Sequence, residues 1–142
     1  MPEAAAPPAV LLDTCAAIWL ANGDPMSSES RAAIGMAQAG PGVFVSPISA
    51  WEIATLVARN RLQLALAPDA WFARLTALPG VRLAPMPPAL LIASAFLPGR
   101  PPRDPADRII AATARGHDLA IVTRDSELIP YGEAGHILTI AC

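Results

Sequence analysis

Residues 9–14 read Ala-Val-Leu-Leu-Asp-Thr, a short apolar run closed by an acidic residue. Four apolar residues in succession predict a strand buried on both faces, and the apolar segment that follows, through Leu20, predicts a helix directly after it. Apolar runs of comparable length predict further strands at residues 43–45, 81–84, 119–122 and 137–140. Helical segments separate these runs, and the alternation is typical of a parallel sheet that helices cover on both faces.

Capping residues and turns bound the predicted helices. Ser46-Pro47 and Asp104-Pro105 each combine an N-cap residue with a proline at the first helical position. Ser27 or Ser28 is expected to cap an earlier helix, which a glycine- and proline-rich turn ends. The helices are predicted at residues 14–20, 28–39, 47–60, 68–78, 87–97 and 105–116, with a short helical turn at 126–129.

The composition fits one domain of ordinary size. Of the 142 residues, 54% are hydrophobic and 15% are charged, which is ample apolar material for a single core. We expect a flexible Ala/Pro-rich leader over residues 1–8 and a single domain over residues 9–142. The amino terminus lacks the basic residues of a signal peptide, glycine and proline interrupt the long uncharged stretches, and two cysteines form no disulfide framework. A soluble cytoplasmic protein is therefore expected.

The basic residues are unusual, because all ten of them are arginine. The absence of lysine excludes P-loop NTPases, phosphoacceptor receiver domains and Schiff-base enzymes, each of which needs a lysine. The net charge of −2 argues against a generally basic nucleic-acid coat. A local arginine cluster could still bind a phosphate backbone.

Four acidic residues are predicted near the carboxyl-terminal edge of the sheet, where open α/β proteins bind ligands: Asp13, Glu52, Asp107 and Asp125. Two unit charges about 4 Å apart repel by ~4 kcal/mol at an effective dielectric of 20, and a divalent cation would remove that repulsion. Hard oxygen ligands favour Mg²⁺ or Mn²⁺ over zinc, which would need His and Cys ligands. The pattern therefore indicates metal-assisted hydrolysis of a phosphodiester.

The same acids also have structural interpretations. Ser49 and Glu52 have the spacing of a capping box. For this pair taken alone, a capping box and a metal-binding role of Glu52 are equally good interpretations. Asp107 could reach back toward the start of its helix, and Asp125 could open the turn that follows it. Asp13 is the hardest to explain in this way, because a carboxylate that closes a buried strand needs a partner.

The remaining polar and aromatic residues carry weaker signals. His117 and His136 show no ligand spacing, so we do not expect them to be catalytic. The sequence has neither a serine nucleophile elbow nor a complete dinucleotide-binding glycine fingerprint. Four aromatic residues are expected in the core or an interface rather than as base-stacking platforms: Trp51, Trp71, Phe72 and Phe96.

Four motifs follow one another at sensible spacing: Leu11-Leu12-Asp13-Thr14, Ser46-Pro47-Ile48-Ser49-Ala50-Trp51-Glu52-Ile53, Arg103-Asp104-Pro105-Ala106-Asp107-Arg108 and Val122-Thr123-Arg124-Asp125. Together they resemble the motifs of PIN-domain ribonucleases of the VapC toxin type, over a match from about Val10 to Ile140. The resemblance implies a three-layer α/β/α sandwich around a parallel sheet and Mg²⁺- or Mn²⁺-dependent endoribonuclease activity. It also implies a homodimer, and inhibition by a small VapB-like antitoxin that inserts into the site, as for the toxin of a toxin–antitoxin pair.

Carried over by position, the resemblance implies three principal metal-binding acids, a more variable fourth and two hydroxyl residues that orient them: Asp13, Glu52 and Asp107, then Asp125, then Thr14 and Thr123. Asp104 matches the residue that caps the helix. The chain departs from the family pattern at Pro102, where many relatives have histidine, and in its Ala/Pro-rich leader. Neither departure touches the proposed metal ligands.

Contact with RNA needs cations near the acids. Three arginines adjoin the acidic motifs and are candidates for that role: Arg103, Arg108 and Arg124. Arg59 and Arg61 follow the helix that carries Glu52, and for these two a solvated helix end is an equally good interpretation.

Two other functions compete with a nuclease. A catalytically weak PIN-like module that binds RNA or protein would normally have lost one or more acids, and here all four are present. A phosphatase with an aspartyl nucleophile would show Asp-x-Asp after the first strand and an active-site lysine. Cys15 occupies the position of that second aspartate.

Overall fold

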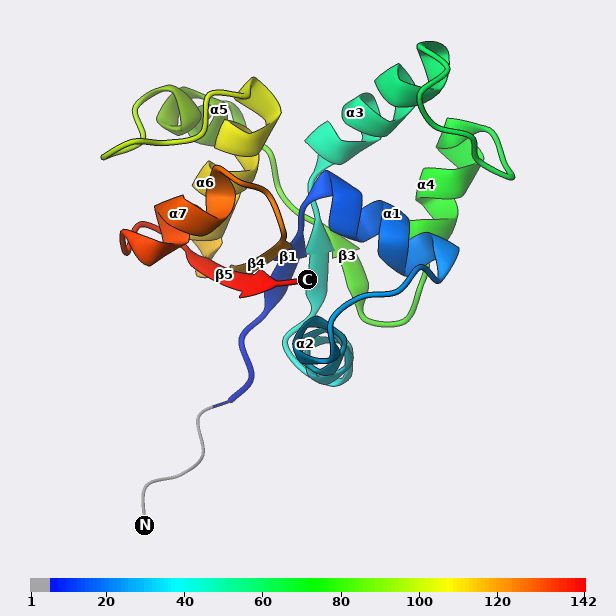
Figure 1. Ribbon diagram of the computed structural model, residues 1–142, viewed down its shortest axis with the longest axis horizontal. Helices are drawn as coiled ribbons and strands as arrows, with labels where there is room; N and C mark the ends of the chain where they lie inside the picture. Colours follow the sequence, from blue (N-terminus) through cyan, green and yellow to red (C-terminus); the bar gives the residue numbers. More distant parts are fainter. Residues whose placement is uncertain (1–5) are drawn as a thin grey trace.

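A parallel sheet of five short strands forms the centre of the computed structural model, which describes residues 6–142 (Figure 1). The strands are β1 (Val10–Leu12), β2 (Val43–Val45), β3 (Val81–Leu83), β4 (Ala120–Thr123) and β5 (Leu138–Ala141), in the spatial order β3-β2-β1-β4-β5. In the central strand, Leu12 is in register with Val45 of β2 and Val122 of β4. The residues that follow these three strands therefore meet at one edge of the sheet.

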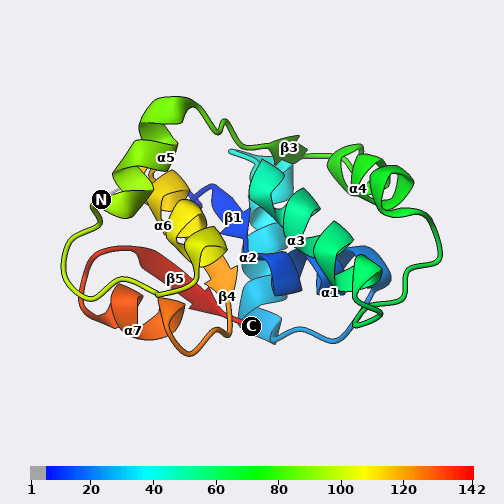
Figure 2. The ribbon, with the colours of Figure 1, turned by 90° about the horizontal axis from the view of Figure 1, so that it is seen from above.

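Helices cover both faces of this sheet. One core cluster joins Val10 and Leu12 to α1 (Thr14–Asn22), α2 (Ser28–Ala39), α3 (Pro47–Ala58) and α4 (Pro68–Thr76). A second cluster joins Leu11 to α6 (Pro105–His117) and α7 (Leu128–Glu133), and α5 (Pro88–Ala95) packs against α6. In Figures 1 and 2, α1, α3 and α4 lie on one side of the sheet and α5, α6 and α7 on the other. The expected three-layer α/β/α sandwich is confirmed.

The apolar run at residues 9–12 forms the buried strand that its sequence predicts. Val10, Leu11 and Leu12 are completely buried, because successive side chains of the central strand point into the two different core clusters. The predicted N-caps are also confirmed. The Ser46 hydroxyl accepts a hydrogen bond from the backbone N–H of Ile48, and the Ser27 hydroxyl accepts one from that of Ser30.

Several helix boundaries differ from the prediction, most of them by one or two residues, and two of these differences have a local cause. The helix expected to end at Gly116 continues to His117, and Asp118 closes it with a φ of 53° and a hydrogen bond from its N–H to the Ala114 carbonyl. Aspartate adopts this left-handed conformation more readily than most residues, so no glycine is needed. The turn predicted at residues 126–129 is α7, which begins later, at Leu128.

The start of the chain is described from residue 6. Of the expected leader at residues 1–8, residues 1–5 lie outside the described part, and residues 6–9 precede β1. No helix within residues 6–142 combines the length and apolar character needed to cross a membrane.

Candidate active site

Asp13 joins the end of β1 to the start of α1. Its Oδ1 accepts a hydrogen bond from the backbone N–H of Ala16 at 2.8 Å, so Asp13 is the N-cap of α1. Its Oδ2 accepts a hydrogen bond from the Thr123 hydroxyl at 2.5 Å. Burial raises the pKa of Asp13, and the bond from Thr123 partly offsets the rise. These are the partners that a carboxylate at the end of a buried strand requires.

Glu52 projects from α3 toward the same edge of the sheet. The Thr14 hydroxyl donates a short hydrogen bond to Glu52 Oε1, and Thr14 Oγ1 also lies 3.0 Å from Ser49 Oγ. The capping-box interpretation of Glu52 is wrong, because Ser46 is the N-cap and Ser49 lies within the helix. Burial raises the pKa of Glu52, and the bond from Thr14 lowers it.

Asp107 lies in the first turn of α6, whose N-cap is Asp104 as expected. Asp104 Oδ1 accepts hydrogen bonds from the backbone N–H groups of Ala106 at 2.7 Å and Asp107 at 3.3 Å. Within residues 6–142 no side-chain or backbone donor bonds to the Asp107 carboxylate itself. Burial first, and then the charge of Asp125, raise the pKa of Asp107 to about 7.

Asp125 follows β4 and has a structural role as well. Its Oδ2 accepts hydrogen bonds from the backbone N–H groups of Glu127 and Leu128, both at 2.9 Å. The expectation that Asp125 opens the following turn is therefore confirmed, and these bonds explain why α7 begins only at Leu128. Its own N–H donates to the Thr123 hydroxyl at 3.0 Å.

All four acids line one pocket of about 340 Å³, together with Thr14, Cys15, Trp19 and Arg124. Asp13 lies between β1 and α1, Asp125 lies between β4 and α7, and the other two acids lie on α3 and α6, so only the folded chain can bring the four together. The raised pKa of Asp13, Glu52 and Asp107 reflects their partial burial and mutual repulsion. Burial first, and then the charges of these acids, raise the pKa of the Cys15 thiol to about 11, so this thiol stays protonated at neutral pH.

The chemistry of the donors fits a hard divalent cation. The pocket offers carboxylate oxygens and no imidazole, which suits Mg²⁺ or Mn²⁺ better than zinc. Within residues 6–142, no group of three or more His, Cys, Asp or Glu side chains is arranged so that it could hold a metal ion by itself. Mg²⁺ does not require such a cage, since it commonly binds one or two carboxylates and keeps several waters.

The sequence matches the PIN domain family over residues 10–133. This chain belongs to that family. It is 34% identical over 119 residues to Ribonuclease VapC22 of Mycobacterium tuberculosis, a match that covers 84% of this chain and 88% of the relative. Two solved structures share the fold of this PIN domain. The structure of VapBC2 from Rickettsia felis bound to a promoter DNA fragment has a TM-score of 0.68 at 12% identity, and covers 93% of this chain and 97% of its own. That of FitAcB from Neisseria gonorrhoeae has a TM-score of 0.53 at 21% identity, with coverages of 92% and 96%.

The arginines proposed for RNA contact are placed differently in this PIN domain. Arg124 lines the acidic pocket. Arg103 is almost fully exposed and forms an ion pair with Glu127 at 3.5 Å. Arg59 and Arg61 are exposed at the end of α3 and do not line the pocket.

Arg108 has a structural role. Its guanidinium donates hydrogen bonds to the carbonyl oxygens of Ser94 at 3.0 Å, Pro102 at 3.2 Å and Ala95 at 3.3 Å. These bonds hold the two ends of the loop between α5 and α6. Three of the five guanidinium donors are thus used by the fold, and contact of Arg108 with RNA stays a prediction.

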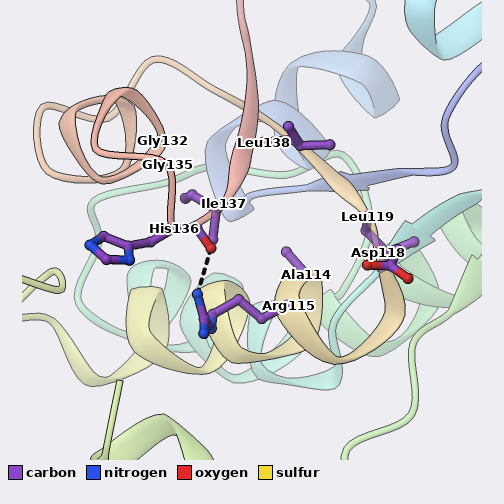
Figure 3. Close-up of a pocket in the computed structure, with 9 residues that line it drawn as sticks. All are labelled: Ala114, Arg115, Asp118, Leu119, Gly132, Gly135, His136, Ile137 and Leu138. Atoms are coloured by element: carbon purple, nitrogen blue, oxygen red, sulfur yellow. Dashed lines mark hydrogen bonds between the residues drawn. The ribbon is translucent and has the colours of Figure 1, made fainter. Parts of the chain in front are cut away.

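The two histidines lie away from the acids. His117 lines an apolar hollow, and His136 lines a pocket of about 370 Å³ with Asp118 and Arg115, whose Nη1 donates to the His136 carbonyl at 2.7 Å (Figure 3). This second pocket is slightly larger than the acidic one, yet Asp118 is its only carboxylate. Size alone therefore does not identify the active site.

The sequence motifs did not assign Cys15 or Trp19 to the acidic pocket that both line, or Ser49 to the contact it makes with Thr14. Cys15 and Trp19 are four residues apart on α1 and therefore lie on the same face of that helix. This spacing is the signal that could have assigned both to the pocket that begins at Asp13. Among the aromatic residues, Trp71 is in the core as expected, whereas Trp51 and Phe96 are 63% and 81% exposed. An interface remains the prediction for these two.

Proposed function

We propose that this PIN domain is an Mg²⁺- or Mn²⁺-dependent endoribonuclease and the toxin of a VapBC-type toxin–antitoxin pair. The observation that carries the proposal is the meeting of four carboxylates from four separate parts of the chain in one pocket. The similarity to a protein named as a ribonuclease supports RNA as the substrate.

Asp13, Glu52, Asp107 and Asp125 are the proposed acids of the metal site. Because no three of the described acidic side chains converge on one point, one or two of them would bind the cation directly and waters would complete its shell. When bound, the cation offsets the repulsion between carboxylates, polarises a phosphoryl oxygen and lowers the pKa of an attacking water. The Thr123 hydroxyl fixes the orientation of Asp13, and the Thr14 hydroxyl fixes that of Glu52. Asp107 has no such partner among the described residues, so its carboxylate is available to the cation. Because its pKa is about 7, it gives up a proton when the site is loaded near neutral pH.

The proposed partners are a small VapB-like antitoxin and a second copy of this chain. The fold shared with the VapBC2 and FitAcB structures supports an antitoxin as a partner. The proposed place of action is the cytoplasm, which is consistent with two free cysteines. Coexpression with the product of a short reading frame adjacent to the gene should suppress RNA cleavage and yield a copurifying complex.

The decisive experiment is cleavage of a structured RNA pool by the purified protein with Mn²⁺ or Mg²⁺, next to an EDTA control. Asp107→Asn should reduce the rate by about 100-fold or more, because a ligand of the cation is lost. Asp118→Asn is the matched control. It makes the same chemical change at an exposed acid outside the pocket, where asparagine tolerates the positive φ, and should cleave like the wild type.

The pattern of fragments decides between the functions. Discrete fragments that need both the metal and Asp107 support a specific nuclease and identify its target. If the wild type and Asp107→Asn behave alike and neither binds the metal, the nuclease proposal is wrong and the protein is a binding module.

A further inference from the structure

Trp19 forms one wall of the acidic pocket. It lies on α1 one turn after Cys15, and both residues line the pocket. The indole is half-buried and packs against the core cluster that joins β1 to α1–α4. Its ring is therefore held by the core and presents a fixed surface at the pocket.

Arg124 lies on that surface. Its guanidinium carbon is 3.9 Å from the centroid of the Trp19 ring, a close cation–π contact. Arg124 directly follows β4, so its backbone is fixed by the sheet, while its side chain is exposed to solvent. The guanidinium also donates a hydrogen bond to the Cys142 side chain. Contact with the indole occupies the face of the guanidinium and leaves its other N–H groups available as donors.

Arg124 forms no ion pair with the acids beside it. Among residues 6–142 the single ion pair joins Arg103 to Glu127, although four carboxylates line the pocket that Arg124 borders. A flexible arginine in such surroundings would normally fold onto a carboxylate, where its charge would be neutralised and its donors occupied. The contact with Trp19 instead stabilises the guanidinium in a position where it pairs with none of these carboxylates.

We propose that Trp19 is a positioning residue that holds Arg124 at the mouth of the acidic pocket, away from the carboxylates, so that Arg124 can bind a phosphate of the RNA backbone. The inference rests on the proposed nuclease function. A phosphodiester that approaches four carboxylates meets a repulsive charge, and a fixed arginine at the entrance offsets part of it. Arginine suits this task because its planar donors match the oxygens of a phosphate.

The test measures RNA binding without cleavage. Asp107→Asn serves as the background, and the anisotropy of a fluorescently labelled RNA oligonucleotide is followed over a series of KCl concentrations. Trp19→Leu retains an apolar side chain against the core and removes the aromatic face, whereas Trp19→Phe restores an aromatic face. Arg31→Ala is the matched control for loss of charge, because Arg31 is exposed on α2 and does not line the pocket.

Trp19→Leu should weaken binding at low salt by about five- to tenfold and reduce the slope of log K against log salt by about 0.7, the loss of roughly one phosphate contact. Trp19→Phe should recover most of the affinity and of the slope. Arg124→Ala should lower both as Trp19→Leu does, and the double variant should lose little more, because both substitutions remove the same contact. A merely structural defect in α1 would not reproduce this pattern.

The outcomes separate the two proposals. If Trp19→Leu binds RNA with unchanged affinity and slope, or if Phe gives no recovery, Trp19 does not position Arg124 and only the inference is overturned. If the Asp107→Asn background binds no RNA at all, the proposed function fails and the inference fails with it. The ¹⁵N NMR signal of Arg124 Nε provides a readout without RNA: the ring current of Trp19 should displace it, and Trp19→Leu should remove that displacement.

Discussion

The hydroxyl of Thr123 donates a hydrogen bond to Asp13 Oδ2 over 2.5 Å and thereby ties the end of β4 to the end of β1. Thr123 is completely buried, and the same hydroxyl accepts the backbone N–H of Asp125 at 3.0 Å. One side chain thus connects two of the four acids. It orients Asp13 directly and holds the backbone at Asp125.

Thr123→Val should separate the effect of the hydroxyl from that of side-chain volume. Valine fills the same space but leaves the Asp13 carboxylate and the Asp125 N–H without this partner, so the free energy of unfolding should fall by about 1–3 kcal/mol. Urea denaturation measures the change. Thr123→Ser retains the hydroxyl and should keep the cleavage activity, whereas valine should reduce it. Equal activity of the two variants would contradict an orienting role for Thr123.

The stability of the metal-free protein should depend on pH through Asp107. Its folded-state pKa of about 7 lies above the 3.8 of an unstructured aspartate, so the folded protein binds this proton more tightly than the unfolded chain does. The stabilisation is complete below about pH 3.8 and is lost as the pH rises to about 7. Asp13 and Glu52 contribute in the same direction, because burial raises the pKa of each. Thermal unfolding in EDTA should show the melting temperature falling over this range.

Asp107→Asn tests the origin of that pH dependence. The amide cannot ionise, so at pH 8 in EDTA the variant should be more stable than the wild type by on the order of 1–2 kcal/mol, a value already reduced for partial solvation. Its melting temperature should also vary less with pH. If the variant is less stable than the wild type at pH 8, the Asp107 carboxylate is not under the repulsion inferred for it.

Cation binding should offset the repulsion between Asp107 and the neighbouring carboxylates. Mn²⁺ or Mg²⁺ should raise the melting temperature of the wild type at pH 7 and release protons, because the Asp107 carboxyl is about half protonated there. Calorimetry in buffers of different ionisation enthalpy measures the proton release. Asp107→Asn should lose most of both effects, while Asp118→Asn should retain them. Proton release by Asp107→Asn equal to that of the wild type would assign the proton to another group.

The sequence was sufficient for the sheet and for its functional edge, because both depend on local patterns. An apolar run closed by Asp13, and the Asp104-Pro105 pair that opens α6, carry their structural meaning within a few residues. The four acids could be placed on one edge because parallel strands that end in register bring their following residues together.

The contacts that tune the site could not be predicted in the same way. Thr14 meets Ser49 from 35 residues away, and Thr123 meets Asp13 from 110 residues away, so no local pattern encodes either pair. Arg108 illustrates a second reason. It adjoins Asp107 in sequence, but neighbouring residues of a helix point in different directions, and Arg108 contacts the loop rather than the pocket.

The loop between α5 and α6 should depend on Arg108 for its order. Three backbone carbonyls accept hydrogen bonds from this guanidinium, and the Tyr131 hydroxyl donates a further bond to the Pro98 carbonyl at 2.6 Å. Arg108→Met keeps much of the apolar stem but removes the charged donors. The free energy of unfolding should therefore fall by about 2–3 kcal/mol. Chymotrypsin should then cleave after Phe96 more rapidly, because the exposed loop loses the bonds that hold its two ends.

Arg103→Met is the matched control for this loop. Its side chain is almost fully exposed and its ion pair with Glu127 spans 3.5 Å, so stability and proteolysis should hardly change. Cleavage of RNA distinguishes the two arginines further. Arg108→Met should lose activity because the loop leads directly into Asp104 and the first turn of α6, which carries Asp107. If Arg108→Met is as stable and as protease-resistant as Arg103→Met, yet binds RNA more weakly, Arg108 contacts the substrate and its structural role is refuted.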